Sequence, residues 1–236
     1  GQLSLSVPCR NVIIGNSCLN QPIPRRMANG FQLDRIFSSF ALSLATATLF
    51  IPLNGASQDD APAKRVGIIF EGSFEKHVNS QKPADSKLTQ MVPYYEWDYG
   101  VRAFDESYWT DNRFTWERIL SISEHVGDNL MEIVEPMAVR DERGVVKYAY
   151  IKDKDPFLTS IIFSKKLIEK FRSSLGDSLH VMLIDRHIVY IFPANGMPIT
   201  DYGPALVEEY RKARLPVSLE VFLVSEDGFR VIGELE

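Results

Sequence analysis

The stretch that decides the fold is "HVMLIDRHIVYIF", residues 180–192. Two runs of aliphatic and aromatic residues, "HVMLI" and "IVYIF", flank the three polar residues Asp185, Arg186 and His187. Runs of this composition that are separated by a short polar segment predict a β-hairpin. The high apolar content of both runs further predicts that the two strands belong to the core.

The polar trio has two interpretations. Asp, Arg and His side by side are the residue types of many catalytic sites, so Asp185, Arg186 and His187 are an alternative candidate site. However, neighbouring residues of an extended chain point to opposite faces, so three in a row rarely converge on one substrate. Asp is also a favoured turn residue, and charges keep a turn in contact with water. We therefore interpret the trio as the soluble tip of the hairpin.

Three segments around this hairpin predict helices. The clearest is 115–136, which has Thr115 as its N-cap and apolar residues at three- and four-residue steps. A second is expected at 158–176, since Gly176 stands at the usual stop position. A third is expected at 200–215, where Pro204 falls in the first turn and its missing N–H is harmless.

The other apolar runs predict strands, and their order predicts the fold class. Strands are expected at 65–70 and 90–104, and hairpins at 137–152 and 218–235. Hairpins that alternate with helices predict an α+β fold, with a largely antiparallel sheet covered by three helices. We expect residues 66–236 to form this single domain.

The N-terminal part has a different character. Residues 36–53, "IFSSFALSLATATLFIPL", carry no charge, follow Arg35 and precede small and polar residues. A basic flank, an apolar run and a small-residue exit are typical of a secretory signal peptide, which predicts cleavage after Ala56 or Ser57. An uncleaved membrane anchor and an internal helix remain alternatives.

The same pattern divides the first 65 residues into three parts. Met27 precedes the apolar run closely, so we expect translation to begin there and residues 1–26 to be an over-extended reading frame. Residues 27–57 are then the signal-peptide-like segment, and residues 58–65 are a flexible linker. This organisation predicts an exported protein of the periplasm or cell envelope, with a cytoplasmic location as the alternative.

Charge and cysteine content exclude several classes of function. Residues 1–57 carry four Arg and one Asp, a net charge of +3, so a net charge of −8 remains for the rest of the chain. Such an acidic body argues against nucleic acid and anionic lipid as partners. Membrane contact is expected only through residues 36–53, if they are not cleaved. Both cysteines, Cys9 and Cys18, precede the body, and zinc and phosphate-loop motifs are missing from the sequence, so neither a metal nor a cofactor is expected.

Aromatic residues concentrate between residues 94 and 116, which include all three tryptophans of the chain. Aromatic rings beside carboxylates bind sugars or peptides by stacking and hydrogen bonds. Trp97, Asp98, Tyr99 and Trp109 are therefore candidate ligand-binding residues. The alternative is that these rings belong to the core and that the carboxylates are simply exposed.

Three segments carry a family resemblance: "YYEWDYG" from Tyr94, "TWERI" at the start of the long helix, and the segment 158–192. With these motifs and the order of its elements, the chain resembles the YtpQ-like domain-of-unknown-function family of bacteria over about residues 94–236. It implies an α+β fold and no known activity, so it assigns no functional residues. It also implies an intracellular role, because members of this family begin directly with the fold.

Together these patterns predict a non-catalytic binding or interaction domain of the bacterial cell envelope. Its partner would be a protein or a small ligand of unknown identity. Two alternatives remain open: a hydrolase with an unrecognised site, and a cytosolic regulatory or interaction protein. Whether the chain is an enzyme stays undecided at this point, although the missing catalytic motifs favour a binding role.

Overall fold

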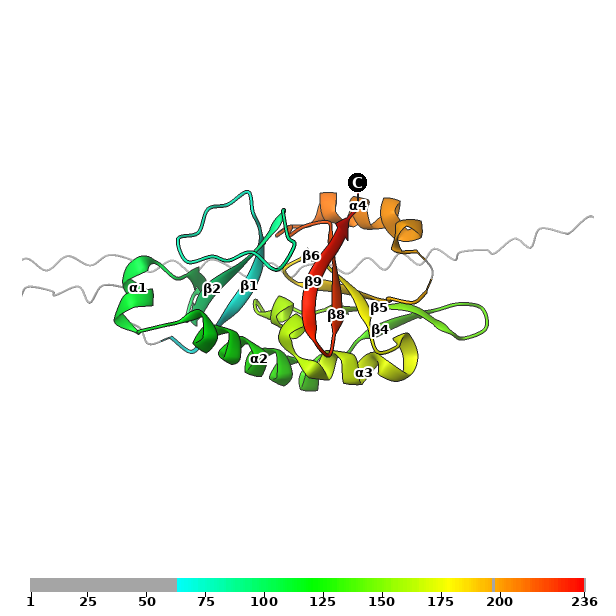
Figure 1. The fold of residues 1–236 in the computed structure, drawn as a ribbon, viewed down its shortest axis with the longest axis horizontal. Helices are drawn as coiled ribbons and strands as arrows, with labels where there is room; N and C mark the ends of the chain where they lie inside the picture. Colours follow the sequence, from blue (N-terminus) through cyan, green and yellow to red (C-terminus); the bar gives the residue numbers. More distant parts are fainter. Residues whose placement is uncertain (1–62, 197, 236) are drawn as a thin grey trace, which may run out of the picture. The chain divides into compact units, whose positions relative to one another are not determined.

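The computed structural model describes residues 63–196 and 198–235, which belong to one compact unit. Strands and helices alternate along this part of the chain, and all strand pairs are antiparallel (Figure 1). The predicted α+β class is therefore confirmed. The strands form two sheets of three and six strands rather than one. The predictions for residues 1–26 and 27–57, and for most of the linker 58–65, lie outside the described residues.

The three-stranded sheet has the order β1-β2-β3. It consists of β1 (Arg65–Gly72), β2 (Thr89–Trp97) and β3 (Gly100–Ala103). The turn between β2 and β3 needs Gly100, whose φ of 134° suits glycine alone. The short helix α1 (Glu106–Asp111) follows. Sequence periodicity does not predict α1, because six residues give less than two turns and none of them is buried.

The six-stranded sheet has the order β4-β5-β7-β6-β8-β9. Its strands are β4 (Met137–Arg140), β5 (Val146–Lys152), β6 (Leu179–Asp185), β7 (Ile188–Pro193), β8 (Glu220–Ser225) and β9 (Gly228–Glu234). The three predicted hairpins, 137–152, 180–192 and 218–235, are all confirmed as antiparallel neighbours. The central hairpin occupies the middle of the sheet, as its apolar strands require.

The structure confirms helices within 115–136 and 200–215, divides the helix predicted over 158–176, and adds α1, which the sequence does not predict. Helix α2 (Trp116–Ile133) begins at the predicted cap, where the Thr115 side chain accepts a hydrogen bond from the Arg118 N–H. Helix α4 (Gly203–Lys212) follows the short 3₁₀ helix η2 (Ile199–Tyr202) and has Pro204 in its first turn.

The single helix predicted over 158–176 is wrong, because the chain forms two elements there. These are the 3₁₀ helix η1 (Leu158–Phe163) and the α-helix α3 (Lys165–Leu175). Ser164 between them has extended backbone angles, and its hydroxyl accepts a hydrogen bond from the Lys166 N–H. The same hydroxyl donates to the carboxylate of Asp128 on α2, so the break is fixed by a side-chain cap and a tertiary contact.

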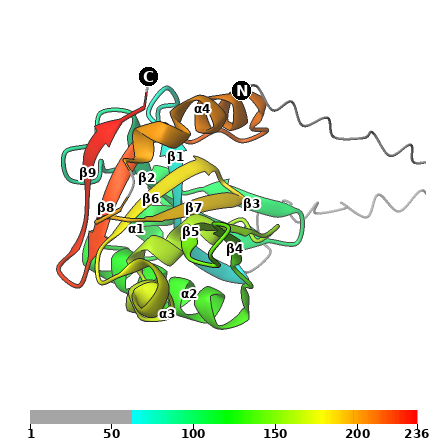
Figure 2. The same cartoon turned by 90° about the vertical axis from the view of Figure 1, so that its right-hand side faces the viewer.

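The two faces of the six-stranded sheet are covered differently. One face, which we call the sealed face, packs in the main core with residues of α2, η1 and α3. Its residues are all buried: Ala149, Ile151, Val181, Leu183, Val189, Ile191, Phe222 and Val224. The other face forms a second core with Leu206 of α4, and it is completed by Met182, Ile184, Phe192 and Val221. Figure 2 shows α4 on one side of this sheet and α2 and α3 on the other.

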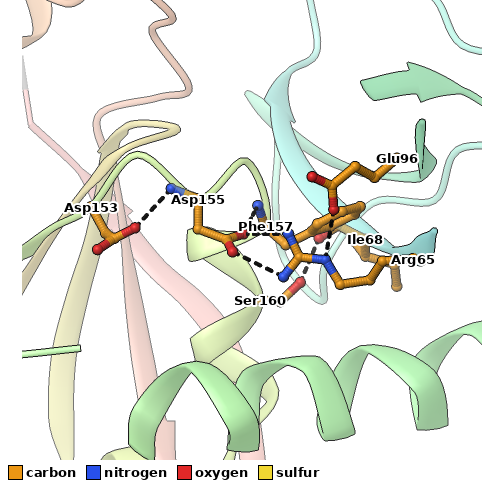
Figure 3. A network of polar contacts seen from close by, with 7 residues as sticks. All are labelled: Arg65, Ile68, Glu96, Asp153, Asp155, Phe157 and Ser160. Carbon is orange, nitrogen blue, oxygen red and sulfur yellow. Dashed lines mark hydrogen bonds and ion pairs between the residues drawn. The ribbon is translucent and has the colours of Figure 1, made fainter. Parts of the chain in front are cut away.

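A polar network connects the beginning of β1 to the segment that links β5 and η1 (Figure 3). The Arg65 guanidinium donates to Glu96 at 2.9 Å and to both carboxylate oxygens of Asp155 at 2.9 and 3.0 Å. It also lies 4.7 Å from the ring centre of Phe157. Burial alone would lower the pKa of Arg65, but Asp155 and Glu96 raise it, so the side chain stays charged. This network holds the two sheets together and is structural.

Candidate ligand-binding site

The aromatic region 94–116 is largely core. Phe104 is only 3% exposed, and its ring contacts Tyr95, Tyr108, Trp109 and Phe114. Tyr95 and Tyr108 stack with ring centres 4.4 Å apart. These contacts attach α1 to the small sheet. For most of this region the structure therefore favours the core interpretation.

The predicted surface of Trp97, Asp98, Tyr99 and Trp109 divides into two parts. Trp97 and Tyr99 meet edge to face at 5.0 Å beside the turn between β2 and β3. Asp98 in this turn forms an exposed ion pair with Lys64 at 2.7 Å. Trp109 instead packs in the Phe104 cluster, and no ring contact between described residues joins it to Trp97. Only three of the four predicted residues lie together.

The trio Asp185, Arg186 and His187 lies at the end of the central hairpin, as predicted, but it is not a soluble tip. Asp185 is 5% exposed, and its carboxylate accepts hydrogen bonds from the N–H groups of His187 and Leu215 at 2.8 and 2.9 Å. The segment after α4 covers this turn, because the Arg186 N–H also donates to the Leu215 carbonyl. Sequence reasoning could not foresee this cover, since the covering segment follows the turn by about 30 residues.

Arg186 points into the interior between the two sheets. Its guanidinium binds the carboxylate of Glu71 on β1 and lies 3.4 Å from the hydroxyl of Tyr94 on β2. Tyr94 donates to the same carboxylate at 2.7 Å. Burial and the charge of Glu71 raise the pKa of Tyr94, so its hydroxyl stays protonated and donates. This cluster is a second joint between the sheets.

His187 lies on the other side of the turn, at a cavity of about 330 Å³ between β7 and the end of α4. The Nδ1 atom of His187 lies 3.5 Å from the Asp185 carboxylate. The cavity is also lined by Lys152, Tyr190, Glu209, Lys212 and Arg214. We call it the α4 cavity. Asp185 and His187 thus share a site that Arg186 does not reach.

A row of aromatic rings leads to this cavity. It occupies β5, β7 and η2 on the face opposite the sealed face, and we call it the tyrosine face. Its members are Tyr148, Tyr150, Tyr190, Phe192 and Tyr202, with ring centres 5.2–6.4 Å apart between neighbours. All four tyrosines are half-buried, and their hydroxyls form no hydrogen bond with another described residue.

Tyr190 belongs to both the tyrosine face and the α4 cavity. Burial, the charge of Glu209 and the neighbouring tyrosines raise the pKa of Tyr190 to about 12. Its hydroxyl is therefore neutral near pH 7 and can both donate and accept a hydrogen bond. The tyrosine face and the α4 cavity together form a continuous surface with ring faces, hydroxyls and charged groups.

Sequence reasoning missed this surface, although part of its signal is visible. In "KYAYIK" and "IVYIF" the aromatic residues stand two positions apart, which places Tyr148 with Tyr150, and Tyr190 with Phe192, on one face of a strand. The missing information is the pairing of β5 with β7, which sets Tyr150 opposite Tyr190. That neighbour relation connects two different hairpins and has no local sequence signal.

Comparison with protein-family models, curated proteins and solved structures finds no significant match to this chain. The resemblance to the YtpQ-like family therefore stays a prediction. Among the described residues, no three His, Cys, Asp or Glu side chains gather as metal ligands would. In the same part of the chain, no helix has the length and apolar character needed to cross a membrane.

Proposed function

We propose that this protein is an exported, non-catalytic binding protein of the bacterial cell envelope, and that its ligand is a glycan. The observation that carries the proposal is the tyrosine face, whose four tyrosines are half-buried and have hydroxyls without a protein partner in the described structure. Tyrosine suits a sugar because its ring stacks on the apolar side of a pyranose while its hydroxyl forms hydrogen bonds.

The geometry of the polar trio supports binding rather than hydrolysis. General acid–base catalysis needs groups that reach the same reacting atom. Here Arg186 binds Glu71 in the interior, while His187 faces the α4 cavity. Both oxygens of Asp185 already accept backbone N–H groups. The trio therefore does not assemble a proton relay.

The envelope location rests on the signal-like segment at residues 36–53 and is tested by mass. Intact-mass measurement of the protein in each fraction of its host cells is expected to find a chain that begins at Ser57 or Gln58 outside the cytoplasm. A chain that keeps residues 27–57 in the membrane would make this an anchored domain. An uncleaved chain in the soluble extract would contradict export and would favour the cytosolic regulatory role.

Glycan binding is tested by co-sedimentation with two insoluble probes, purified peptidoglycan sacculi and bead-immobilised polygalacturonate. The wild-type protein is expected in the pellet, and Tyr150→Ala is expected in the supernatant because this change removes a central ring of the tyrosine face. Phe74→Ala is the control, since Phe74 is an exposed aromatic residue outside the tyrosine face and outside the predicted aromatic surface. Equal sedimentation of both variants, or no sedimentation of the wild type with either probe, would contradict the proposal.

A further inference from the structure

We propose that the α4 cavity recognises the carboxylate of a uronic-acid unit in an acidic polysaccharide. This inference rests on the proposed function and specifies its ligand. It follows from the charges that line the cavity, from its continuity with the tyrosine face, and from the hydrogen-bonding groups that no other described residue satisfies.

The first observation is the basic rim of the cavity. Lys152, Lys212 and Arg214 line it, and all three are exposed. Lys152 and Arg214 form no ion pair with another described residue, while Lys212 pairs with Glu208 at 3.1 Å on the outside of α4. Two free cations at one cavity are notable in a chain whose part after residue 57 carries a net charge of −8. Charge complementarity therefore favours an anionic group here.

The second observation concerns the two acidic residues of the cavity. The Asp185 carboxylate is buried and accepts two backbone hydrogen bonds, so its role is to hold the turn. Glu209 is exposed and has no ion-pair partner among the described residues. A free carboxylate beside cations disfavours a bare phosphate, but it accepts hydrogen bonds from hydroxyl groups. The ligand that satisfies both signs of charge is a polyhydroxylated anion.

The third observation is the position of His187 and Tyr190. The Nδ1 atom of His187 lies toward Asp185, so its Nε2 atom is the nitrogen available to a ligand. Tyr190 forms one wall of the cavity, and its ring centre lies 5.8 Å from that of Tyr150. A sugar chain on the tyrosine face would thus place one unit in the cavity, where its carboxylate meets Lys152 and Arg214.

The experiment compares two probes by isothermal titration calorimetry with the protein from residue 58 onward, the mature chain expected after signal cleavage. The probes are tetragalacturonate and its fully methyl-esterified form, which have the same rings but differ in charge. We expect the acid to bind at least about tenfold more tightly than the ester, a difference of about 1.4 kcal/mol. We also expect this preference to shrink as the ionic strength rises.

Two charge variants and one control test which residues cause the preference for the acid over the ester. Lys152→Gln and Arg214→Gln should each reduce the preference for the acid over the ester several-fold. Lys165→Gln removes the same charge from the exposed start of α3 and should leave the preference intact. A similar loss in Lys165→Gln would show that only net charge matters and would overturn the proposed site.

The remaining outcomes separate this inference from the proposed function. Equal affinity for acid and ester, with both lost in Tyr150→Ala, would overturn the carboxylate site and leave glycan binding on the tyrosine face intact. Binding of neither probe would also overturn the carboxylate site, while the sedimentation experiment decides the proposed function independently.

Discussion

The two faces of the six-stranded sheet are built from alternate residues of the same strands, yet they differ in chemistry. On β5, Ile151 is fully buried, while its neighbour Tyr150 is half-buried on the opposite face. The sealed face carries aliphatic residues and Phe222, and it ends at the Arg186–Glu71 ion pair. The tyrosine face carries tyrosines and ends at Lys152 and Arg214. Neither the tyrosine hydroxyls nor these two cations have a partner among the described residues. The comparison separates a face that is buried in the main core from the face on which we propose that the ligand binds.

The largest loss of stability is expected from breaking the buried ion pair between Arg186 and Glu71 at the end of the sealed face. Arg186→Met leaves the buried Glu71 carboxylate without its cation, which should lower the free energy of unfolding by about 3–5 kcal/mol. The double variant Arg186→Met, Glu71→Gln removes both charges and should recover much of this loss. Urea denaturation of the two variants and the wild type measures both differences. A loss below about 1 kcal/mol in the single variant would show that the pair is not structural.

Substitutions at two neighbouring residues of β5 test directly whether the sealed face and the tyrosine face differ in their contribution to stability. Ile151→Ala creates a cavity in the sealed face and should cost about 2–5 kcal/mol of unfolding free energy. Tyr150→Ala, one residue earlier, should cost about 1 kcal/mol or less because its ring remains half in contact with water. The measurement is again urea denaturation. Equal costs would mean that both faces are core and would remove the basis for the binding proposal.

A smaller loss of stability is expected when Glu220 on β8, which is 1% exposed, becomes protonated. Burial alone would raise the pKa of Glu220, but the nearby Thr89 side chain and hydrogen bonds from the Leu88 amide, the Ser86 hydroxyl and the Lys87 amide lower it below the ordinary value of a glutamate. Because the pKa is lower in the folded state, this stabilisation is present above the unfolded pKa and is lost as the pH falls through the folded value.

The pH dependence of stability therefore tests the role of Glu220. Between about pH 5 and pH 3 the wild type should lose more stability than Glu220→Gln, which has no charge to protonate. Thermal unfolding measured across this range gives the comparison. Parallel curves for the two proteins would show that the Glu220 carboxylate does not hold the 86–88 segment against the sheet.

Sequence patterns predicted the elements whose signals are local. The long helix was found because Thr115 caps it and its apolar residues repeat regularly, and each hairpin was found from two runs around a turn. The break at Ser164 was missed because apolar residues continue on both sides of it, so periodicity does not show it. Only the contact between Ser164 and Asp128 on α2 reveals why the helix is divided.

The binding surface was less predictable because it depends on contacts between distant segments. The predicted aromatic cluster is dense in sequence, but that density reflects the packing of Phe104 and its neighbours. The sequence suggests only a catalytic or a turn role for Arg186, because its ion-pair partner Glu71 lies 115 positions earlier. The tyrosine face requires β5 beside β7, and the α4 cavity adds residues from a helix that follows both strands.

The most direct test of the central claim is an NMR titration of the isotope-labelled protein with tetragalacturonate, followed through its backbone amide signals. We expect the shifted signals to belong to residues 148–152, 187–190 and 209–214, which surround the tyrosine face and the α4 cavity. Shifts confined to the turn of Trp97, Asp98 and Tyr99 would contradict the account and would place the binding surface on the three-stranded sheet instead.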